Sequence, residues 1–194
     1  MATLHPMSTN ISPIAPDITM GALLESYPGA QRAMFAKYHI GGCKSCGFRP
    51  DETLAEVCER NDNIAVDDAI AHIQEAHTRD LASQIIPTDL KAQLDAPDLP
   101  SPQLLDLRTR EEHENGSITG TELFTQDKLQ EIMGSWEKDR EIVIYDHLGT
   151  STCMDAAAYL QGHGFTNVKT LRGGIDAYAQ EADNSINRYR IEIA

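Results

Sequence analysis

The stretch Ile142-Val143-Ile144-Tyr145-Asp146-His147-Leu148-Gly149-Thr150-Ser151-Thr152 decides the fold of the second half of this 194-residue chain. Its first four residues form a short apolar run, which is typical of a parallel strand that is buried on both faces. The residues that follow are polar and include a glycine, and a helical pattern then runs over 153–161. The sequence therefore predicts a strand, a tight loop and a helix in direct succession.

Similar apolar runs lie on both sides of this stretch, at 104–107 and 168–171. Helical patterns at 88–94 and 127–133 separate the runs. Strands that alternate with helices favour a parallel sheet covered by helices. We therefore expect an α/β domain over 83–184, followed by a C-terminal tail over 185–194.

Three further motifs support a family resemblance for this half. The sequence LLDLR at 104–108 resembles the motif "LiDvR", GSITG at 116–120 resembles "GHIpGA", and LRGGIDAY at 171–178 resembles "LeGGi.aW". Each motif is weak alone, but their order and separations match those of the rhodanese family. The second half thus resembles a rhodanese-like domain, and the resemblance implies the α/β rhodanese fold.

In the rhodanese family, a cysteine follows the central strand and begins a six-residue "CRxGxR" loop that holds a thiolate and then a persulfide. In this sequence the length of the loop is kept, but its residues are Asp146, His147, Leu148, Gly149, Thr150 and Ser151. Asp146 takes the position of the cysteine, and His147 and Ser151 take those of the arginines. A carboxylate can occupy a ring of backbone N–H groups, but it cannot carry a transferable sulfur atom. We therefore expect a degenerate loop that serves the fold or docks a partner, and no ordinary thiosulfate sulfurtransferase activity.

The first half of the chain has helical patterns. Residues 1–16 are rich in Pro, Ser and Thr and are expected to form a flexible tail. Thr19, Asp51 and Asp67 are candidate N-caps of successive helices, and Gly41-Gly42 interrupts the helical pattern just before Cys43-Lys44-Ser45-Cys46. The sequence predicts a small all-α domain over 17–80 with a CxxC pair at a turn between helices.

This half resembles the family of hybrid-cluster-protein-associated redox-disulfide domains. The resemblance depends on DITM at 17–20 leading into LLESYP, on GCKSC at 42–46, and on ETLAEV at 52–57. It implies a small helical fold with a CxxC pair and no settled activity.

Three uses of Cys43 and Cys46 stay open. Two intervening residues let the sulfurs form a reversible disulfide, and either thiol could carry a persulfide that the other resolves. The pair could also ligate zinc or an iron–sulfur cluster, for which it supplies two of the four usual ligands. Cys58 and His39 could complete such a set, although Cys58 lies on an apolar helical face with Leu54 and Val57 and is expected in the core.

Cys153 also has two interpretations. As a displaced nucleophile it would use the start of the helix after the loop, and as a small apolar residue it would be buried in the core. We expect the second.

Charge excludes some classes of partner. The formal net charge is -14, with 11 acidic and 6 basic residues in 1–80 and 19 acidic and 10 basic residues in 81–194. Both halves would repel nucleic-acid phosphate and anionic lipid, so we expect no nucleic acid and no membrane as partner. The sequence contains no apolar run of about 20 residues and no signal-peptide pattern at its start, so we expect a cytoplasmic location.

The leading hypothesis is a sulfur- or redox-related protein in which the CxxC pair carries thiol, persulfide or disulfide chemistry. The degenerate rhodanese-like domain would bind or present a partner, which is expected to be a sulfur-carrier or redox protein. The first alternative is a sulfurtransferase that uses Cys43, Cys46 or Cys153 as nucleophile. The second is an iron–sulfur or zinc protein, whereas the leading hypothesis needs no cofactor. The sequence leaves the oligomeric state open.

Overall fold

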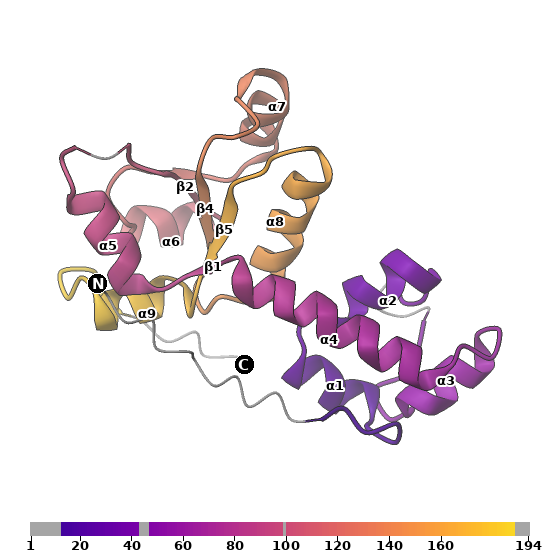
Figure 1. The fold of residues 1–194 in the computed structure, drawn as a ribbon. Coiled ribbons are helices and arrows are strands. Elements are labelled where there is room, and N and C mark those ends of the chain that lie inside the picture. Colours follow the sequence, from indigo (N-terminus) through magenta and orange to yellow (C-terminus); the bar gives the residue numbers. More distant parts are fainter. Residues whose placement is uncertain (1–12, 43–46, 99, 189–194) are drawn as a thin grey trace, which may run out of the picture. The chain divides into compact units, whose positions relative to one another are not determined.

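A computed structural model describes residues 13–42, 47–98 and 100–188 of the chain. The chain divides into two compact units, residues 1–75 and residues 76–194. The first is called the helical unit here and the second the sheet unit, and each is described by itself. The helical unit contains helices α1 to α3 and most of α4, and the sheet unit contains a parallel sheet with helices on both faces (Figure 1).

The helices of the helical unit are α1 (Met20–Ser26), α2 (Ala30–Tyr38), α3 (Leu54–Arg60) and α4 (Val66–Ala82), the last of which continues into the sheet unit. The predicted cap of α1 is confirmed, because the Thr19 side chain accepts a hydrogen bond from the backbone N–H of Ala22. The predicted cap Asp51 is wrong: Thr53 caps α3 in a capping box with Glu56. This reciprocal arrangement satisfies two backbone N–H groups at once, which an isolated aspartate cannot do.

The predicted cap of α4 is also wrong. The helix begins at Val66, so Asp67 and Asp68 lie inside its first turn. There the two carboxylates still favour the helix, because the first turn carries the positive end of the helix dipole.

The core of the helical unit forms where the four helices meet. Its buried residues include Met20, Leu23, Met34, Leu54, Val57, Cys58 and Ile73. Cys58 has 1% of its surface exposed, which confirms that it packs in the core. Burial raises the pKa of the Cys58 thiol, so the thiol stays protonated and packs as a small apolar group.

The sheet unit has five parallel strands in the order β1-β5-β4-β2-β3. They are β1 (Gln84–Ile85), β2 (Gln103–Asp106), β3 (Thr121–Leu123), β4 (Ile142–Tyr145) and β5 (Val168–Leu171). The three predicted strands are β2, β4 and β5. The edge strands β1 and β3 were not predicted because two or three residues give too short a run for an alternating or continuous apolar pattern.

Five helices follow the strands: α5 (Pro87–Asp95), α6 (Arg110–Asn115), α7 (Gln126–Ser135), α8 (Ser151–Gly162) and α9 (Gly174–Glu181). Helices α7 and α8 lie on one face of the sheet, and α5 and α9 lie on the other (Figure 1). Neighbouring strand residues point to opposite faces: Ile144 packs with α7 and α8, whereas Tyr145 packs with α9. This arrangement explains why β4 is apolar throughout, since both of its faces are buried.

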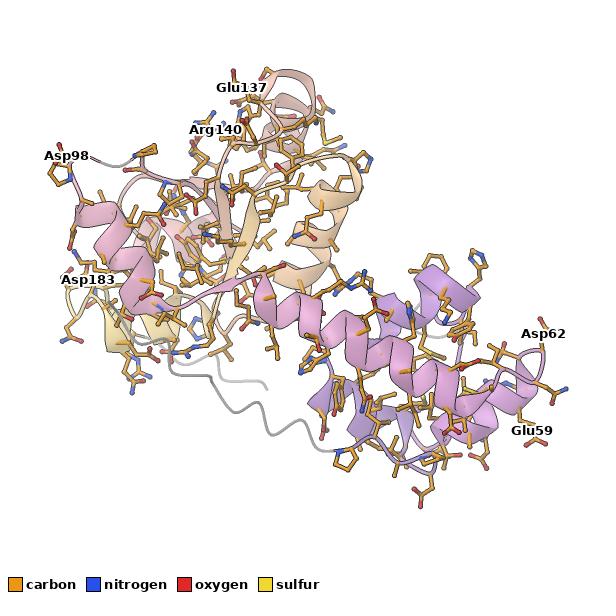
Figure 2. All side chains as sticks on the ribbon, in the orientation of Figure 1. Glu59, Asp62, Asp98, Glu137, Arg140 and Asp183 are labelled. Atoms are coloured by element: carbon orange, nitrogen blue, oxygen red, sulfur yellow. The ribbon has the colours of Figure 1, made fainter. Side chains whose placement is uncertain are left out.

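The acidic composition shows on the outside of both units (Figure 2). Glu59 and Asp62 lie at the end of α3 in the helical unit, and Asp98 and Asp183 lie at the periphery of the sheet unit, all of them exposed or half-buried. The acids therefore lie mostly outside the core, and Glu52, Asp106 and Asp146 are buried exceptions.

Candidate functional site

The loop that follows β4 is built around the carboxylate of Asp146. Its Oδ1 accepts hydrogen bonds from the backbone N–H groups of Leu148 at 3.1 Å, Gly149 at 2.6 Å and Thr150 at 3.2 Å. Its Oδ2 accepts from the Thr150 hydroxyl and, at 3.2 Å, from the Thr150 N–H. Asp146 has only 9% of its surface exposed. The loop therefore forms a ring of N–H donors whose anion is supplied by the chain itself.

The same loop is hydrogen-bonded to the start of α9. The carbonyl oxygen of Asp146 accepts from the Ile175 N–H at 2.9 Å, and that of His147 accepts from the Asp176 N–H at 3.1 Å. A Cβ on Gly174 would lie 2.6 Å from both of these oxygens, and the φ of Gly174 is +61°. A side chain at this position would force the two segments apart, so glycine is required there.

Gly149 also packs against the residues at the start of α9. Its φ is +72°, and a Cβ on it would lie 2.8 Å from the N of Gly173. The glycines of the loop and of the Gly173-Gly174 pair therefore allow two backbones to pack directly against each other. These contacts and the hydrogen bonds above join the loop to the start of α9.

The residues expected at the site are brought together by this loop, but their surroundings differ. His147 is buried, Leu148 is 58% exposed at the tip, and Ser151 begins α8 with Thr150 as its N-cap. Within residues 146–151 the carboxylate is the group that the backbone N–H groups surround. The ring of N–H donors in this loop is therefore already occupied by the Asp146 carboxylate.

Cys153 lies near this loop in α8 and is completely buried. It packs in the cluster that includes Ile132, Ile144 and Phe165. Burial and then the negative charge of Asp146 raise the pKa of the Cys153 thiol far above its usual range. A nucleophilic cysteine needs a lowered pKa and access to its substrate, so the geometry favours the prediction that Cys153 is a core residue.

A buried charged cluster lies at the end of the neighbouring strand β2, and two of its members, Asp106 and Arg108, belong to the LLDLR motif. The guanidinium of Arg108 donates to both oxygens of Asp106, from Nε at 3.0 Å and from Nη2 at 2.7 Å. Nδ1 of His113 lies 3.0 Å from Asp106 Oδ2, and Arg108 Nη2 also donates to the Gly116 carbonyl at 2.8 Å. The spacing Asp-x-Arg at the end of an apolar strand was the signal that could have revealed this pair.

This cluster contacts Tyr145, the last residue of β4, directly before the loop. Asp106 pairs in register with Tyr145, the residue before Asp146. The Tyr145 ring lies 5.7 Å from the Arg108 guanidinium, and its buried hydroxyl accepts a hydrogen bond from the Ile118 N–H. Burial, with the charge of Asp106, raises the pKa of Tyr145 well above its usual range. The cluster therefore fixes the end of β4.

The second candidate site, the Cys43 and Cys46 pair, lies outside the described residues, but both ends of the segment are described. A Cβ on Gly47 would lie 2.5 Å from the N of Gly41, so the backbones of these two glycines are in direct contact. The Gln31 side chain donates to the Gly41 carbonyl at 2.7 Å, and the Arg60 side chain donates to the Gly47 carbonyl at 2.8 Å. The residues that flank the undescribed segment are therefore in contact, and the side chains of Gln31 and Arg60 bind their carbonyl groups.

Neither of the residues considered as extra metal ligands joins a ligand set among the described residues. Cys58 is in the core, and His39 ends α2 in the left-handed conformation, with its ring 6.0 Å from that of Phe35. In the described ranges 13–42, 47–98 and 100–188, no group of three or more His, Cys, Asp or Glu side chains could hold a metal ion. Over the same ranges, no helix combines the length and apolar character needed to cross a bilayer.

Comparisons with known proteins agree with this fold. Residues 86–181 match the family model described as Rhodanese-like domain. The chain is 33% identical to the Thiosulfate sulfurtransferase GlpE of Shewanella oneidensis over 78 residues, which are 40% of this chain and 76% of that protein. It is 36% identical to a Sulfurtransferase of Allochromatium vinosum over 77 residues, which are 40% of this chain and 71% of that protein.

Among solved structures, the crystal structure of the Alr3790 protein from Anabaena sp. is 28% identical and covers 50% of this chain and 78% of its own, with a TM-score of 0.46. The family model and the two relatives, each more than 30% identical over more than two thirds of its own length, establish the family. The chain belongs to the rhodanese-like domain family.

Proposed function

We propose that this is a sulfur- or redox-related protein in which Cys43 and Cys46 carry the thiol chemistry and the rhodanese-like unit serves as a binding module. In this proposal Asp146 occupies the position at which rhodaneses place their nucleophilic cysteine. The hybrid-cluster-associated type of CxxC domain, over 17–80, would supply the reactive thiols, and the rhodanese-like domain would extend over 83–184.

One observation carries the proposal for the rhodanese-like unit. The donors of the loop after β4 converge on the carboxylate of Asp146, with three N–H···O distances between 2.6 and 3.2 Å to one oxygen. An incoming thiosulfate would meet a carboxylate of the same sign of charge with its donors already engaged. Cys153, the single cysteine of residues 76–194, is buried. Support for a sulfur-related role comes from the two relatives that are named as sulfurtransferases.

The contact between Gly41 and Gly47 supports thiol chemistry in the helical unit. Because Gly41 and Gly47 are in contact, the two cysteines belong to a short segment whose two ends are held together. Two thiols that are held close along the chain form a disulfide, or resolve a persulfide, with little loss of chain entropy.

The test uses the full-length protein and two assays. Formation of thiocyanate from thiosulfate and cyanide is expected to stay at the level of the blank. After treatment with a persulfide donor, intact-mass analysis is expected to show the addition of one sulfur atom, which peptide mapping places on Cys43 or Cys46. The double variant Cys43→Ser/Cys46→Ser is expected to abolish the adduct, and Cys153→Ser, the matched control in the sheet unit, is expected to retain it.

Two results would contradict the proposal. Thiocyanate formation that persists in the double variant Cys43→Ser/Cys46→Ser would place catalysis in the rhodanese-like unit. A visible absorption band with stoichiometric iron, or tightly bound zinc, after anaerobic purification would favour the alternative in which the CxxC pair binds a metal. The proposal also includes a cytoplasmic location, a sulfur-carrier or redox protein as partner, no nucleic-acid or membrane partner, and no cofactor.

A further inference from the structure

After α9 the chain forms a turn that leads back onto the sheet unit. The Asp183 N–H donates to the Tyr178 carbonyl at 3.0 Å, and Asp183 lies just beyond the end of the helix (Figure 2). Its Oδ1 accepts from the N–H of Ser185 at 3.0 Å and from the Ser185 hydroxyl at 2.6 Å, and its carbonyl accepts from the Ile186 N–H at 3.2 Å. These bonds give a defined path to residues 183–188, which are called the strap here.

The first anchor of the strap is apolar. The half-buried Ile186 side chain packs against a cluster of buried residues that includes Ile118, Ile175 and Tyr178. A Cβ on Gly116 would lie 3.9 Å from Cγ2 of Ile186, so this side chain also lies against the backbone at the end of α6. The Gly116 carbonyl is the group that accepts from the buried Arg108 guanidinium. Ile186 therefore rests on a segment that the buried cluster after β2 holds in place.

The second anchor of the strap is ionic. The Arg188 guanidinium donates to both oxygens of Asp176, from Nε at 2.8 Å and from Nη2 at 2.8 Å. The N–H of Asp176 in turn donates to the His147 carbonyl at 3.1 Å. Arg188 therefore binds the residue that joins α9 to the loop after β4.

The two anchors together hold the strap only weakly. Half of the Arg188 side chain is exposed, and an ion pair in contact with water contributes little to stability. Ile186 is half-buried, and Asn187 between the two anchors is exposed. A terminal segment with so few buried contacts opens without unfolding of the unit that it covers.

Opening of the strap uncovers an apolar patch beside Gly116 and the carboxylate of Asp176. An apolar patch next to a carboxylate is complementary to an extended segment with one aliphatic and one basic side chain. Residues 81–194 contain 19 acidic and 10 basic residues, so the charge of the unit also favours a basic partner segment.

We propose that the strap is a built-in competitor for a partner protein, whose extended segment carries an aliphatic side chain two residues before an arginine or lysine. The inference rests on the part of the proposed function in which the rhodanese-like unit is a binding module. A segment tethered to its own site has an effective concentration in the millimolar range. Ile186 and Arg188 therefore keep the surface closed to weak ligands, and a partner gains access when it displaces both anchors.

The experiment uses isotope-labelled full-length proteins and NMR spectroscopy. The proteins are the natural chain, Arg188→Gln and the double variant Ile186→Ser/Arg188→Gln. The probe is a capped synthetic peptide with the sequence of residues 183–188, and the same peptide with Ile186→Ser is the control ligand. Arg172→Gln is the matched control protein, because it breaks another exposed ion pair of α9, Arg172–Glu181 at 3.1 Å.

Two results are expected. Hydrogen exchange of the Ile186 N–H is expected to become about twofold to fivefold faster in Arg188→Gln and to stay unchanged in Arg172→Gln. The peptide is expected to shift the amide resonances of Gly116 and Asp176 in the double variant. The natural chain is expected to need about tenfold more peptide for the same shift, because its own strap competes. The control peptide is expected to shift neither resonance.

Three results overturn the inference. These are a double variant in which the peptide leaves the Gly116 and Asp176 resonances unchanged, a natural chain that binds the peptide as readily as the double variant does, and an Ile186 N–H that exchanges only when the whole unit unfolds. Arg188→Gln keeps the apolar anchor, so the exchange measurement tests the strap even if the double variant is unstable. The persulfide assay on Cys43 and Cys46 tests the thiol chemistry separately, so either conclusion can fail while the other stands.

Discussion

Replacing Asp146 by alanine tests how the loop after β4 is held. The change removes the acceptor for the N–H groups of Leu148, Gly149 and Thr150 and for the Thr150 hydroxyl. A hydrogen bond to a charged group contributes roughly 1.5–3 kcal/mol. Leu148 and Thr150 are exposed, so water replaces part of the loss. We expect the free energy of unfolding of the sheet unit to fall by about 2–4 kcal/mol.

Trp136 provides the assay for this prediction. It is the single tryptophan of the chain, it packs in the core of the sheet unit at the end of α7, and the guanidinium of Arg140 lies 4.4 Å from its ring. Its fluorescence during urea unfolding therefore reports on the sheet unit. Asp146→Asn keeps one acceptor oxygen and is expected to lose about 1 kcal/mol.

Thr152→Ala is the control, because Thr152 is exposed in the first turn of α8. Its stability is expected to stay within about 0.5 kcal/mol of the natural chain. A loss below about 0.5 kcal/mol for Asp146→Ala, equal to that of an ordinary surface substitution, would refute the reasoning. It would mean that the carboxylate neither holds the loop nor fills its ring of N–H donors.

Three further predictions concern the same unit. Gly174→Ala is expected to lower the free energy of unfolding by more than about 3 kcal/mol, because its Cβ would lie 2.6 Å from two carbonyl oxygens. In Gly134→Ala, in α7, the new Cβ meets no atom within 4 Å, so this variant is expected to be more stable by up to about 1 kcal/mol. Urea unfolding checks both variants. Arg108→Met is expected to cost about 3–5 kcal/mol, because it removes the guanidinium that pairs with the buried carboxylate of Asp106, and a smaller loss in the double variant with Asp106→Asn would verify this cause. Cys153 is expected to resist iodoacetamide at pH 8 until urea unfolds the unit, and rapid labelling in the folded protein would contradict its burial.

The main architecture could be predicted from local patterns. The runs at β2, β4 and β5 are apolar because both faces of a central parallel strand are covered, and that composition is visible in the sequence. The order of the motifs was sufficient to indicate the rhodanese-like fold. The positions of the loop residues 146–151 after β4 also followed from the sequence, because the strand before them and the helix after them have clear patterns.

Helix caps and short strands were harder to predict. Asp51 and Thr53 are both residue types that cap helices, and the reciprocal hydrogen bonds with Glu56 decided in favour of Thr53. Strand β1 has two residues and exists because Gln84 and Ile85 pair with the end of β5. Whether so short a segment forms a strand depends on a pairing partner far away in the chain.

The sequence by itself determined which chemistry is absent from residues 146–151: their side chains contain no sulfur, and this follows from residue identity alone. Only the tertiary structure decided that three N–H groups enclose the Asp146 carboxylate, that Cys153 is buried beside it, and that Arg60 and Gln31 hold the two ends of the CxxC segment. The physical reason is the separation along the chain over which each property is defined. Residue type and helical or strand periodicity are local properties, whereas burial, ion pairing and backbone contact join segments that are separated along the chain and become defined only when the chain is folded.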